Sequence, residues 1–490
     1  MRVEWREHDG VVTPFYEQGA GNWEPGIWAA QRGSQDTILS CPIFELLIHG
    51  DRGGGKTDVL IMDFAQHVGL GFRDFWKGIL FRRTFPELSD IIAKTKHWFP
   101  RIFPSATYNE ANHVWRWPQG ESLQLSYMDR PEHYSKHHGH AYPWMGWEEL
   151  TTYPDDKCYR LMMSCSRSSR PGMPRKIRNT TNPYGRGHNW VKARWNLPHQ
   201  GMIGPTITEV SSEGIPMKRV AIECRLRENL ILMAAEPDYR AKIEMAARNP
   251  QEMKAWLENN WDIVSGGMFD DIWNKDVHIV PNIPLNAIPA EWKTFRGYDH
   301  GQSKPFSVGW WAQSNGEPIE VEGRTLGGVP EDRFRVAEWY GWNGSPNEGV
   351  RMGAYDIGRG IVQRENQWGM VDIRPGPADA SIFDDYEPGK SVAGDMRRAG
   401  VRWEPCDKRK GSRTQGWEQM RKMLRGALSR EEPGLFVCKR CTQFIRTVPV
   451  LCRSDSNPDD VDTETEDHVG DEVRYVSRHR ISASKSRSNW

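Results

Sequence analysis

Apolar residues show two kinds of spacing in the first half of the chain. Residues 44–48 and 78–81 are short apolar runs with the length of buried strands. Between them, Leu60, Phe64 and Val68 recur at helical spacing. Strand, helix and strand in this order predict a parallel sheet with right-handed crossover connections. The pattern therefore indicates an α/β fold.

The pattern changes further along the chain. Residues 191–265 are rich in Met, Ala, Glu and Leu, which predicts a small helical subdomain, and the Gly266-Gly267 pair then interrupts the chain. A second alternating region begins near residue 294, and the end of the chain is rich in Ser, Arg and Lys, which predicts a mobile basic tail. We expect five parts: an N-terminal extension (1–43), a first α/β core (44–190), a helical subdomain (191–266), a second α/β domain (267–476) and the tail (477–490).

Length and composition limit the class of protein. A chain of 490 residues is too long for one hydrophobic core, so two or three domains are expected. The hydrophobic share of 38% and the charged share of 27% indicate a soluble globular protein. The chain contains no run of eighteen apolar residues and begins with a charged stretch, so we expect neither a membrane span nor a signal peptide.

The charge balance and the cysteines give further information on the class of protein. Lys and Arg number 65 and Asp and Glu also number 65, which argues mildly against a general duplex-DNA binder. A local basic face would still serve a protein along which DNA slides. The 8 cysteines are spread over a long chain that has no secretory segment, which favours reduced thiols over disulfides. Cys438 and Cys441 alone have metal-ligand spacing, and without a second pair nearby they are expected to be ordinary core cysteines and not a zinc site.

A phosphate-binding motif follows the first apolar strand. The pattern G-x-x-x-x-G-K-[ST] is met in full by Gly50, Asp51, Arg52, Gly53, Gly54, Gly55, Lys56 and Thr57. The glycines allow successive backbone N–H groups to point at a phosphate, and the start of the following helix adds its positive dipole end. We expect this P-loop (residues 50–57) to bind ATP, with Lys56 at the β- and γ-phosphates and Thr57 on Mg²⁺.

Two adjacent acids and an amide-rich turn come next. Glu148 and Glu149 close an apolar run, and adjacent residues at a strand end point to opposite faces. We assign Glu148 to Mg²⁺ and Glu149 to activation of the attacking water, against the alternative of solvated surface charge. Residues 179–190 follow an expected third strand, and here Asn182 can sense the γ-phosphate, although spacing alone is equally typical of an ordinary turn.

The second half of the chain contains separated acids. Asp299 ends one expected strand, Asp379 follows later, and Asp467 and Asp471 share one helical face with His468 close to Asp471. Three carboxylates from distant positions can hold two divalent cations for phosphodiester cleavage, and such hard ligands suit Mg²⁺ or Mn²⁺. Because acids are abundant here, the pattern alone supports this triad only weakly. The neighbouring basic loop, residues 406–413, either contacts DNA or is solvated.

The ordered series of these motifs, from about residue 44 to residue 476, resembles the large subunit of tailed-bacteriophage terminases. The matching segments are the arginine-containing P-loop, residues 81–88, the acid pair, residues 182–190, and the acidic segments at Asp299, Asp379 and residues 457–475. The resemblance implies a RecA-like (ASCE) P-loop ATPase followed by an RNase H-like nuclease. It also implies a catalytic role for Arg52, coupling of hydrolysis to motion by residues 180–182, and Asp299, Asp379 and Asp471 as nuclease acids with His468 as a supporting metal ligand.

The chain departs from the family pattern in places. Glu148 stands where the family usually has Asp, Ala380 stands where proline is common, and Gly470 and Glu472 interrupt a helix that is usually rich in alanine. Asp467 is a rival to Asp471 as the third nuclease ligand. A ring ATPase is expected to receive an arginine finger from a neighbouring subunit, and Arg83 and Arg130 are the candidates.

By this resemblance, ATP hydrolysis would drive double-stranded viral DNA into a procapsid, and a two-metal endonuclease would cut the concatemer. The implied partners are double-stranded DNA, the portal protein and procapsid, the small terminase subunit and further copies of the chain in a ring, expected to be a pentamer. The expected location is the host cell cytoplasm. Two alternatives stay open: a helicase or repair ATPase-nuclease, and a scaffold subunit that binds nucleotide without hydrolysing it.

Overall fold

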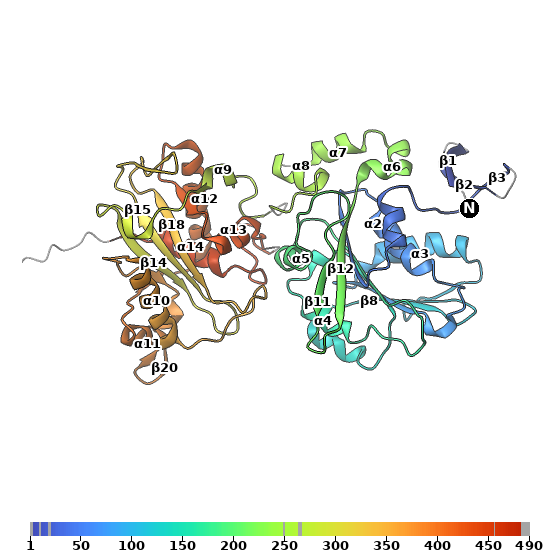
Figure 1. The fold of residues 1–490 in the computed structure, drawn as a ribbon, viewed down its shortest axis with the longest axis horizontal. Coiled ribbons are helices and arrows are strands. Elements are labelled where there is room, and N and C mark those ends of the chain that lie inside the picture. Colours follow the sequence, from blue (N-terminus) through green and yellow to red (C-terminus); the bar gives the residue numbers. More distant parts are fainter. Residues whose placement is uncertain are drawn as a thin grey trace, which may run out of the picture. The chain divides into compact units, whose positions relative to one another are not determined.

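The structure, a computed structural model, describes residues 3–8, 11–17, 21–247, 250–262, 267–454 and 456–481. The chain divides into two compact units, residues 1–265 and 266–490 (Figure 1). Both units are mixed α/β, as the sequence predicts. Within the described residues, each helix is too short or too polar to cross a bilayer.

The first unit is built on a large, mainly parallel sheet. Its strands are β4 (Glu45–Gly50), β5 (Lys77–Arg82), β6 (Thr107–Asn109), β7 (Val114–Arg116), β8 (Ser122–Tyr127), β9 (Trp144–Trp147), β10 (Lys176–Thr180), β11 (Ile207–Val210) and β12 (Pro216–Cys224). They lie in the order β11-β12-β4-β10-β9-β5-β8-β7-β6, and the run from β12 to β8 is parallel. Strand β10 therefore lies between the P-loop strand β4 and the acid-pair strand β9, in agreement with the parallel sheet that the sequence predicts.

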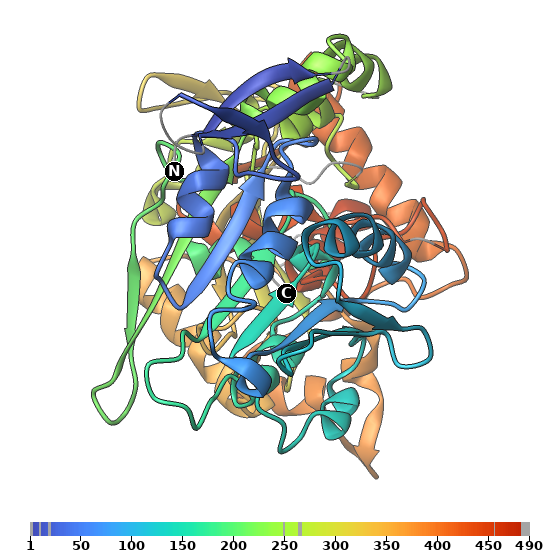
Figure 2. The same cartoon turned by 90° about the vertical axis from the view of Figure 1, so that its right-hand side faces the viewer.

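Helices cover this sheet, and a small sheet precedes it. The helices are α1 (Ser34–Ser40), α2 (Lys56–Ala65), α3 (Leu88–Ile102), α4 (Lys157–Met163), α5 (His188–Trp195), α6 (Leu230–Ala235), α7 (Tyr239–Ala246) and α8 (Pro250–Leu257). Strands β1 (Val3–His8), β2 (Val11–Glu17) and β3 (Trp23–Pro25) form the antiparallel small sheet. Strand β2 contacts α6, and Figure 2 shows the small sheet beside this helix.

One predicted boundary in the first unit is wrong. The region 191–266 is not helical throughout, because β12 pairs in parallel with β4 over residues 219–224 and so completes the large sheet. The physical reason is the short run Val220-Ala221-Ile222, which is buried like a central strand although helix formers follow it. The helical part is therefore limited to α6, α7 and α8.

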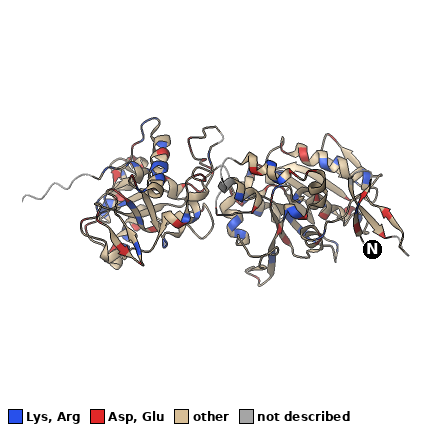
Figure 3. Cartoon of the chain, turned by 90° about the horizontal axis from the view of Figure 1, so that it is seen from above, with Lys and Arg blue, Asp and Glu red and all other residues tan. Residues whose placement is uncertain are grey.

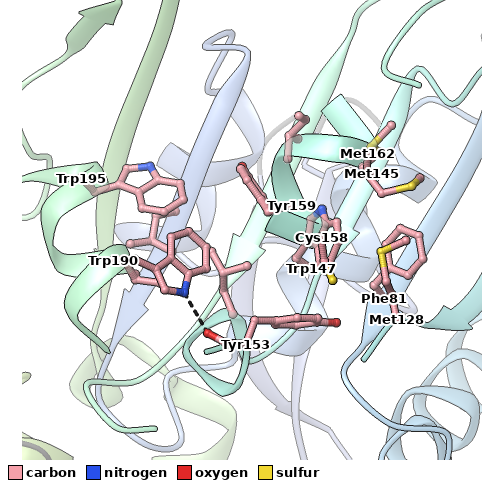
Figure 4. Close-up of a cluster of buried hydrophobic side chains, with 14 of the residues drawn as sticks. Phe81, Met128, Met145, Trp147, Tyr153, Cys158, Tyr159, Met162, Trp190 and Trp195 are labelled. Carbon is pink, nitrogen blue, oxygen red and sulfur yellow. Dashed lines mark hydrogen bonds between the residues drawn. The ribbon is translucent and has the colours of Figure 1, made fainter. Parts of the chain in front are cut away.

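Both faces of the large sheet are buried, which explains its nearly continuous apolar strands. One face packs on a cluster of aromatic and sulfur-containing side chains around Trp147 and Tyr159 (Figure 4). Within this cluster Trp190 Nε1 donates a hydrogen bond of 2.8 Å to the carbonyl of Tyr153, so the indole is buried with its polar atom satisfied. The opposite face packs on a second cluster that contains Phe64, Trp76 and Trp144.

A buried carboxylate joins α2 to the sheet. Asp63 is fully buried and lies 3.1 Å from Lys176 Nζ and 3.3 Å from Arg178 Nε, and it accepts a hydrogen bond of 2.9 Å from Trp144 Nε1. Burial alone would raise the pKa of Asp63, but Arg178 and Lys176 lower it below its usual value. Asp63 therefore neutralises two buried cations and fixes the helix that follows the P-loop.

We expect Asp63→Ala to destabilise the first unit by about 3–5 kcal/mol, because it leaves two buried cations without their counter-ion. Since the folded pKa is lowered, the contribution of Asp63 is present above the unfolded pKa and is lost as the pH falls through the folded pKa. Urea denaturation at neutral and acidic pH measures both effects. Glu110→Ala is the control, since its side chain is 70% exposed; a loss for Asp63→Ala as small as that of the control would contradict the prediction.

The second unit is built on another mixed sheet. Its strands are β13 (Ile279–Val280), β14 (Lys293–Asp299), β15 (Ser307–Gln313), β18 (Arg333–Tyr340), β19 (Pro377–Ala378), β22 (Glu404–Pro405) and β23 (Leu435–Cys438), in the order β13-β23-β18-β15-β14-β19-β22. Strand β15 is antiparallel to β14 and β18, whereas β19 and β22 continue in parallel with β14. This mixed sheet agrees with the second α/β domain that the sequence predicts.

The remaining elements of the second unit surround this sheet. Two short pairs are β16 (Ile319–Val321) with β17 (Arg324–Leu326), and β20 (Asp385–Glu387) with β21 (Lys390–Ser391). The helices are α9 (Lys275–His278), α10 (Ala354–Trp368), α11 (Val392–Arg398), α12 (Ser412–Ser429), α13 (Thr442–Thr447) and α14 (His468–Arg478). Helix α14 contacts β14 and β15. It is buried along almost its whole length, so polar residues on it lie inside the unit.

The predicted start of the basic tail needs correction. Ser477 and Arg478 belong to α14, where Ser477 is buried and donates a hydrogen bond of 2.8 Å to the carbonyl of Val473. Residues 479–481 follow α14 without regular secondary structure, and residues 482–490 of the predicted tail lie outside the described residues. Acidic and basic residues are interspersed over each unit (Figure 3), in keeping with the equal numbers of the two charges.

Candidate functional site

The P-loop connects β4 to α2, as its motif requires. Gly53 and Gly55 have φ values of 80° and 82°, a region that L side chains rarely adopt. A Cβ atom on Gly50 would lie 2.3 Å from the carbonyl oxygen of Cys224 on β12, so this position also needs glycine. The loop therefore packs closely against Cys224 at the end of β12.

Lys56 ties the loop to the end of β10. Its Nζ donates hydrogen bonds to the carbonyls of Gly50 (3.2 Å) and Asp51 (2.7 Å) and to Oδ1 of Asn182 (2.8 Å). Burial lowers the pKa of Lys56, while the neighbouring Glu149 raises it. The ammonium group is thus fixed at the loop, where the motif places the β- and γ-phosphates.

Thr57 and Glu148 come together at the carboxyl end of β9. The Thr57 hydroxyl donates a hydrogen bond of 2.5 Å to Glu148 Oε1, and Glu148 Oε2 lies 3.1 Å from Arg82 Nε. This Oε2 atom is buried and accepts no hydrogen bond from the described residues. Burial raises the pKa of Glu148 to about 7, against the effect of Arg82. A hydroxyl and a buried carboxylate with a spare acceptor fit the hard ligand set of Mg²⁺.

Glu149 contacts different partners from Glu148, as expected for adjacent residues at a strand end. Its backbone has a φ of 53°, an uncommon conformation for a residue other than glycine. Its Oε2 accepts a hydrogen bond of 2.8 Å from the Tyr184 hydroxyl, and its Oε1 lies 3.4 Å from Asn182 Nδ2. Asn182 therefore contacts both Lys56 and Glu149, and these groups together can surround a terminal phosphate and its attacking water.

Lys56, Thr57, Glu149 and Asn182 line one pocket of about 580 Å³ in the first unit. The pocket is bounded by the P-loop, Glu149 and Asn182 and, across from them, by Trp28, α6 and Tyr239. Arg52 also lines it, and its guanidinium lies 3.9 Å from the ring centroid of Trp256 on α8. The position of Arg52 between the loop and α8 allows a charge to reach bound phosphates, and its catalytic role stays a prediction.

The two arginine-finger candidates differ in their surroundings. Arg83 donates a hydrogen bond of 3.0 Å to the carbonyl of Thr152, beside the acid pair. The side chain of Arg130 is 75% exposed and lies 3.8 Å from Asp129. Exposure suits an arginine that acts on a neighbouring subunit better than an internal contact does, and the choice between the two stays a prediction.

The second acidic site lies where β14 and β19 end. Tyr298 and Ala378 are paired in these parallel strands, and Asp299 and Asp379 are the next residue of each. Asp299 accepts a hydrogen bond of 3.2 Å from the Tyr475 hydroxyl of α14. Burial raises the pKa of Asp299 to about 7. The predicted acids are therefore gathered at one edge of the sheet beside α14.

The third acid has two candidates on α14. Asp471 lies 2.9 Å from Arg413 NH1 and accepts a hydrogen bond of 2.9 Å from Arg474 Nε. Asp467 lies 3.1 Å from Arg413 NH2, and burial and the nearby Asp471 raise its pKa to about 6. Both acids form an ion pair with Arg413, so the geometry does not decide between Asp467 and Asp471 as the third nuclease acid.

Both ring nitrogens of His468 contact other side chains, those of Asp299 and Asn347. Its Nδ1 lies 3.4 Å from Asp299 Oδ2, and its Nε2 lies 3.0 Å from Asn347 Oδ1. Burial alone would lower the pKa of His468, but Asp299 and Asp467 raise it. With both ring nitrogens engaged, this arrangement favours a role in orienting Asp299; metal ligation by His468 stays a prediction.

The acids of the second unit do not form a preassembled metal cage. Across the described residues, no group of three or more His, Cys, Asp or Glu side chains is arranged to hold a metal ion. Asp379 is engaged by Lys408 Nζ at 2.9 Å, and Asp471 is engaged by Arg413. Carboxylate oxygens at one edge of the sheet are suitable ligands for divalent cations. In this structure, Lys408 and Arg413 form ion pairs with Asp379 and Asp471.

Sequence reasoning missed several of these partners. Arg82 was not assigned to Glu148, although Arg82 ends β5, Glu148 follows β9, and these neighbouring parallel strands end at the same edge of the sheet. Tyr184 and Tyr475 lay within the quoted motifs, yet the spacing gives no sign that their hydroxyls reach Glu149 and Asp299. Arg413 lay within the basic loop, where contact with DNA or solvent was expected instead of contact with acids.

Solved structures provide the comparison with known proteins. The large terminase of a thermophilic bacteriophage in complex with ADP aligns over 92% of this chain and 98% of its own, with 14% identity and a TM-score of 0.38. The large terminase of bacteriophage HK97 aligns over 90% and 93%, with 10% identity and a TM-score of 0.41. The solved structures that this chain resembles are thus large terminases. The nuclease domain of the P22 large terminase aligns over 43% of this chain and 90% of its own, with 13% identity and a TM-score of 0.30.

These neighbours include terminase ATPase and nuclease domains as well as nearly full-length large terminases. No protein-family model and no curated protein matches the chain. Every quoted TM-score is below 0.5, so we infer function from the residues of this chain and not from the alignments.

Proposed function

We propose that this protein is a terminase large subunit, in which ATP hydrolysis translocates double-stranded viral DNA into a procapsid and a second, metal-dependent centre cuts the DNA. The observation that carries the proposal is the presence of two separate polar centres in one chain. The first surrounds the P-loop with Lys56, Glu149 and Asn182. The second gathers Asp299, Asp379 and α14 at the edge of an RNase H-like sheet.

In the ATPase centre, the loop amides and Lys56 bind the β- and γ-phosphates. Thr57 and Glu148 would hold Mg²⁺, which supplies charge neutralisation to the phosphates when bound. Glu149 orients and deprotonates water while the Tyr184 hydroxyl holds its carboxylate in place. Asn182 contacts both Lys56 and Glu149, so loss of the γ-phosphate would be felt at the end of β10, which is how hydrolysis would be coupled to motion.

In the nuclease centre, Asp299 and Asp379, with Asp471 or Asp467, would hold Mg²⁺ or Mn²⁺. Bound divalent cations supply a nucleophile and stabilise the leaving oxygen in phosphodiester cleavage. His468 and Tyr475 orient Asp299 from the two sides of its carboxylate. The edge of the sheet thus presents oxygen ligands that are held in place by hydrogen bonds.

The proposal includes assembly partners. A ring of copies, a pentamer by family resemblance, would dock to the portal of a procapsid in the host cell cytoplasm, with the small terminase subunit delivering DNA. The exposed Arg130 suits contact with the nucleotide of an adjacent copy better than Arg83 does.

A packaging assay distinguishes this proposal from a helicase or repair enzyme. Purified protein, matching procapsids, linear double-stranded DNA and ATP are expected to yield DNA that resists added DNase, with no separation of the strands. Replacement of ATP by a non-hydrolysable analogue is expected to remove this protection. ATP-dependent unwinding in the absence of procapsids, without protected DNA, would overturn the packaging proposal in favour of a helicase.

A further inference from the structure

Basic side chains from one segment cover the carboxylates of the second site. Lys408 and Arg413 belong to residues 406–413, between β22 and the first turn of α12. Lys408 Nζ lies 2.9 Å from Asp379 Oδ1. Arg413 NH1 donates to both carboxylate oxygens of Asp471, at 3.0 and 2.9 Å, and its NH2 donates to Asp467 at 3.1 Å.

The contacts of the two cations differ in strength. The side chain of Arg413 is 28% exposed, and its Nε donates a further hydrogen bond of 2.7 Å to Asp460. One guanidinium thus bridges three carboxylates through charge-assisted hydrogen bonds, which are the strong kind. The side chain of Lys408 is 54% exposed, so its single ion pair is weak and exchanges easily.

The segment that carries both cations is anchored beside the site. The Cys406 amide donates a hydrogen bond of 2.9 Å to the carbonyl of Ala378, next to Asp379. From α14, Arg478 donates hydrogen bonds of 3.0 Å to the Ser412 carbonyl and 2.9 Å to Asp407. These hydrogen bonds hold the backbone of the segment beside the site, so movement of the two basic side chains is enough to release the acids.

We infer that Lys408 and Arg413 form a cationic latch on Asp379, Asp467 and Asp471, which competes with divalent cations for the same oxygens. The inference rests on the proposed nuclease function, because it concerns the carboxylates assigned there to metal. The Arg413 guanidinium covers both oxygens of Asp471, and its positive charge repels a metal ion that approaches the same carboxylate. The latch stabilises the acidic edge in the metal-free protein and keeps the nuclease idle at low concentrations of divalent cation.

Direct metal binding tests the latch without any measurement of cleavage. Mn²⁺ is titrated into the full chain without nucleotide or DNA, and free Mn²⁺ is followed by electron paramagnetic resonance. Relative to wild type, we expect Arg413→Gln to lower the Kd for Mn²⁺ about tenfold and Lys408→Gln about threefold, because a charge-assisted bridge is lost in one and an exposed pair in the other. Arg409→Gln is the matched control from the same segment, since Arg409 is 86% exposed and pairs with Asp407; its Kd should equal that of wild type.

The outcomes separate the latch from the metal site itself. If wild type binds Mn²⁺, Asp299→Ala removes that binding, and the folded Arg413→Gln and Lys408→Gln variants bind no more tightly than wild type, the latch is overturned and the metal site stands. If wild type shows no Mn²⁺ binding that depends on Asp299, the proposed metal site fails and the latch fails with it. Thermal unfolding checks the fold of each variant. Should Arg413→Gln not fold, Lys408→Gln decides alone, because its exposed side chain is not needed for folding.

Discussion

Replacement of Glu149 by glutamine is expected to lower the kcat of ATP hydrolysis about 10³-fold, within the range for loss of a positioned general base. The glutamine keeps the size of the side chain and a hydrogen-bond acceptor for Tyr184, but it cannot take a proton from water. Lys56, Thr57 and the loop amides are unchanged, so the affinity for ATP should stay within a factor of about three of wild type. Steady-state phosphate release measures kcat, and titration with a fluorescent ATP analogue measures binding.

The matched control is Glu110→Gln, which removes the same charge from an exposed position in the same unit. Its kcat should equal that of wild type. A Glu149→Gln variant that hydrolyses ATP at the wild-type rate would show that another group activates the water. Equal and negligible rates in wild type, Glu149→Gln and Lys56→Ala would instead favour the scaffold subunit that binds nucleotide without hydrolysis.

The sequence is most informative where a function depends on consecutive residues. The P-loop occupies eight positions whose glycines, lysine and threonine act through local backbone geometry, and strand and helix flank it as the apolar pattern predicts. The separate partners of Glu148 and Glu149 could be expected in the same way, because adjacent residues at a strand end point to opposite faces. The structural role of Asp63 could not be predicted, because its ion-pair partners Lys176 and Arg178 are more than a hundred positions away in the sequence.

Features that depend on strand neighbours were harder to predict. Strand β12 was overlooked because three apolar residues next to helix formers do not reveal a parallel partner as distant as β4. Arg82 reaches Glu148 only because β5 and β9 are adjacent in the sheet. The basic segment at 406–413 resembled a solvated or DNA-contacting loop, because no periodicity indicates that Arg413 faces the acids of α14.

Replacement of Asp299 by alanine is expected to lower Mn²⁺-dependent plasmid cleavage by about 10³-fold or more, since metal ions supply several kcal/mol of stabilisation to the transition state and each 1.4 kcal/mol is a factor of ten. Asp299 is the acid that His468 and Tyr475 hold at the end of the central strand β14. Its loss removes one ligand and leaves two orienting groups without their target. ATP hydrolysis should stay at the wild-type rate, because the P-loop pocket belongs to the other unit.

Two further variants show whether the loss of cleavage is specific to the nuclease centre. Asp356→Ala, an exposed acid on α10 in the same unit, should cleave like wild type. Lys56→Ala should cleave plasmid at the wild-type rate while it loses ATP hydrolysis. If cleavage survives Asp299→Ala, the metal-binding triad is assigned to the wrong residues, whereas loss of both activities together would point to unfolding, which the melting temperature reports. Cleavage that depends on Asp299 and not on Lys56 is the outcome that a separate nuclease centre requires.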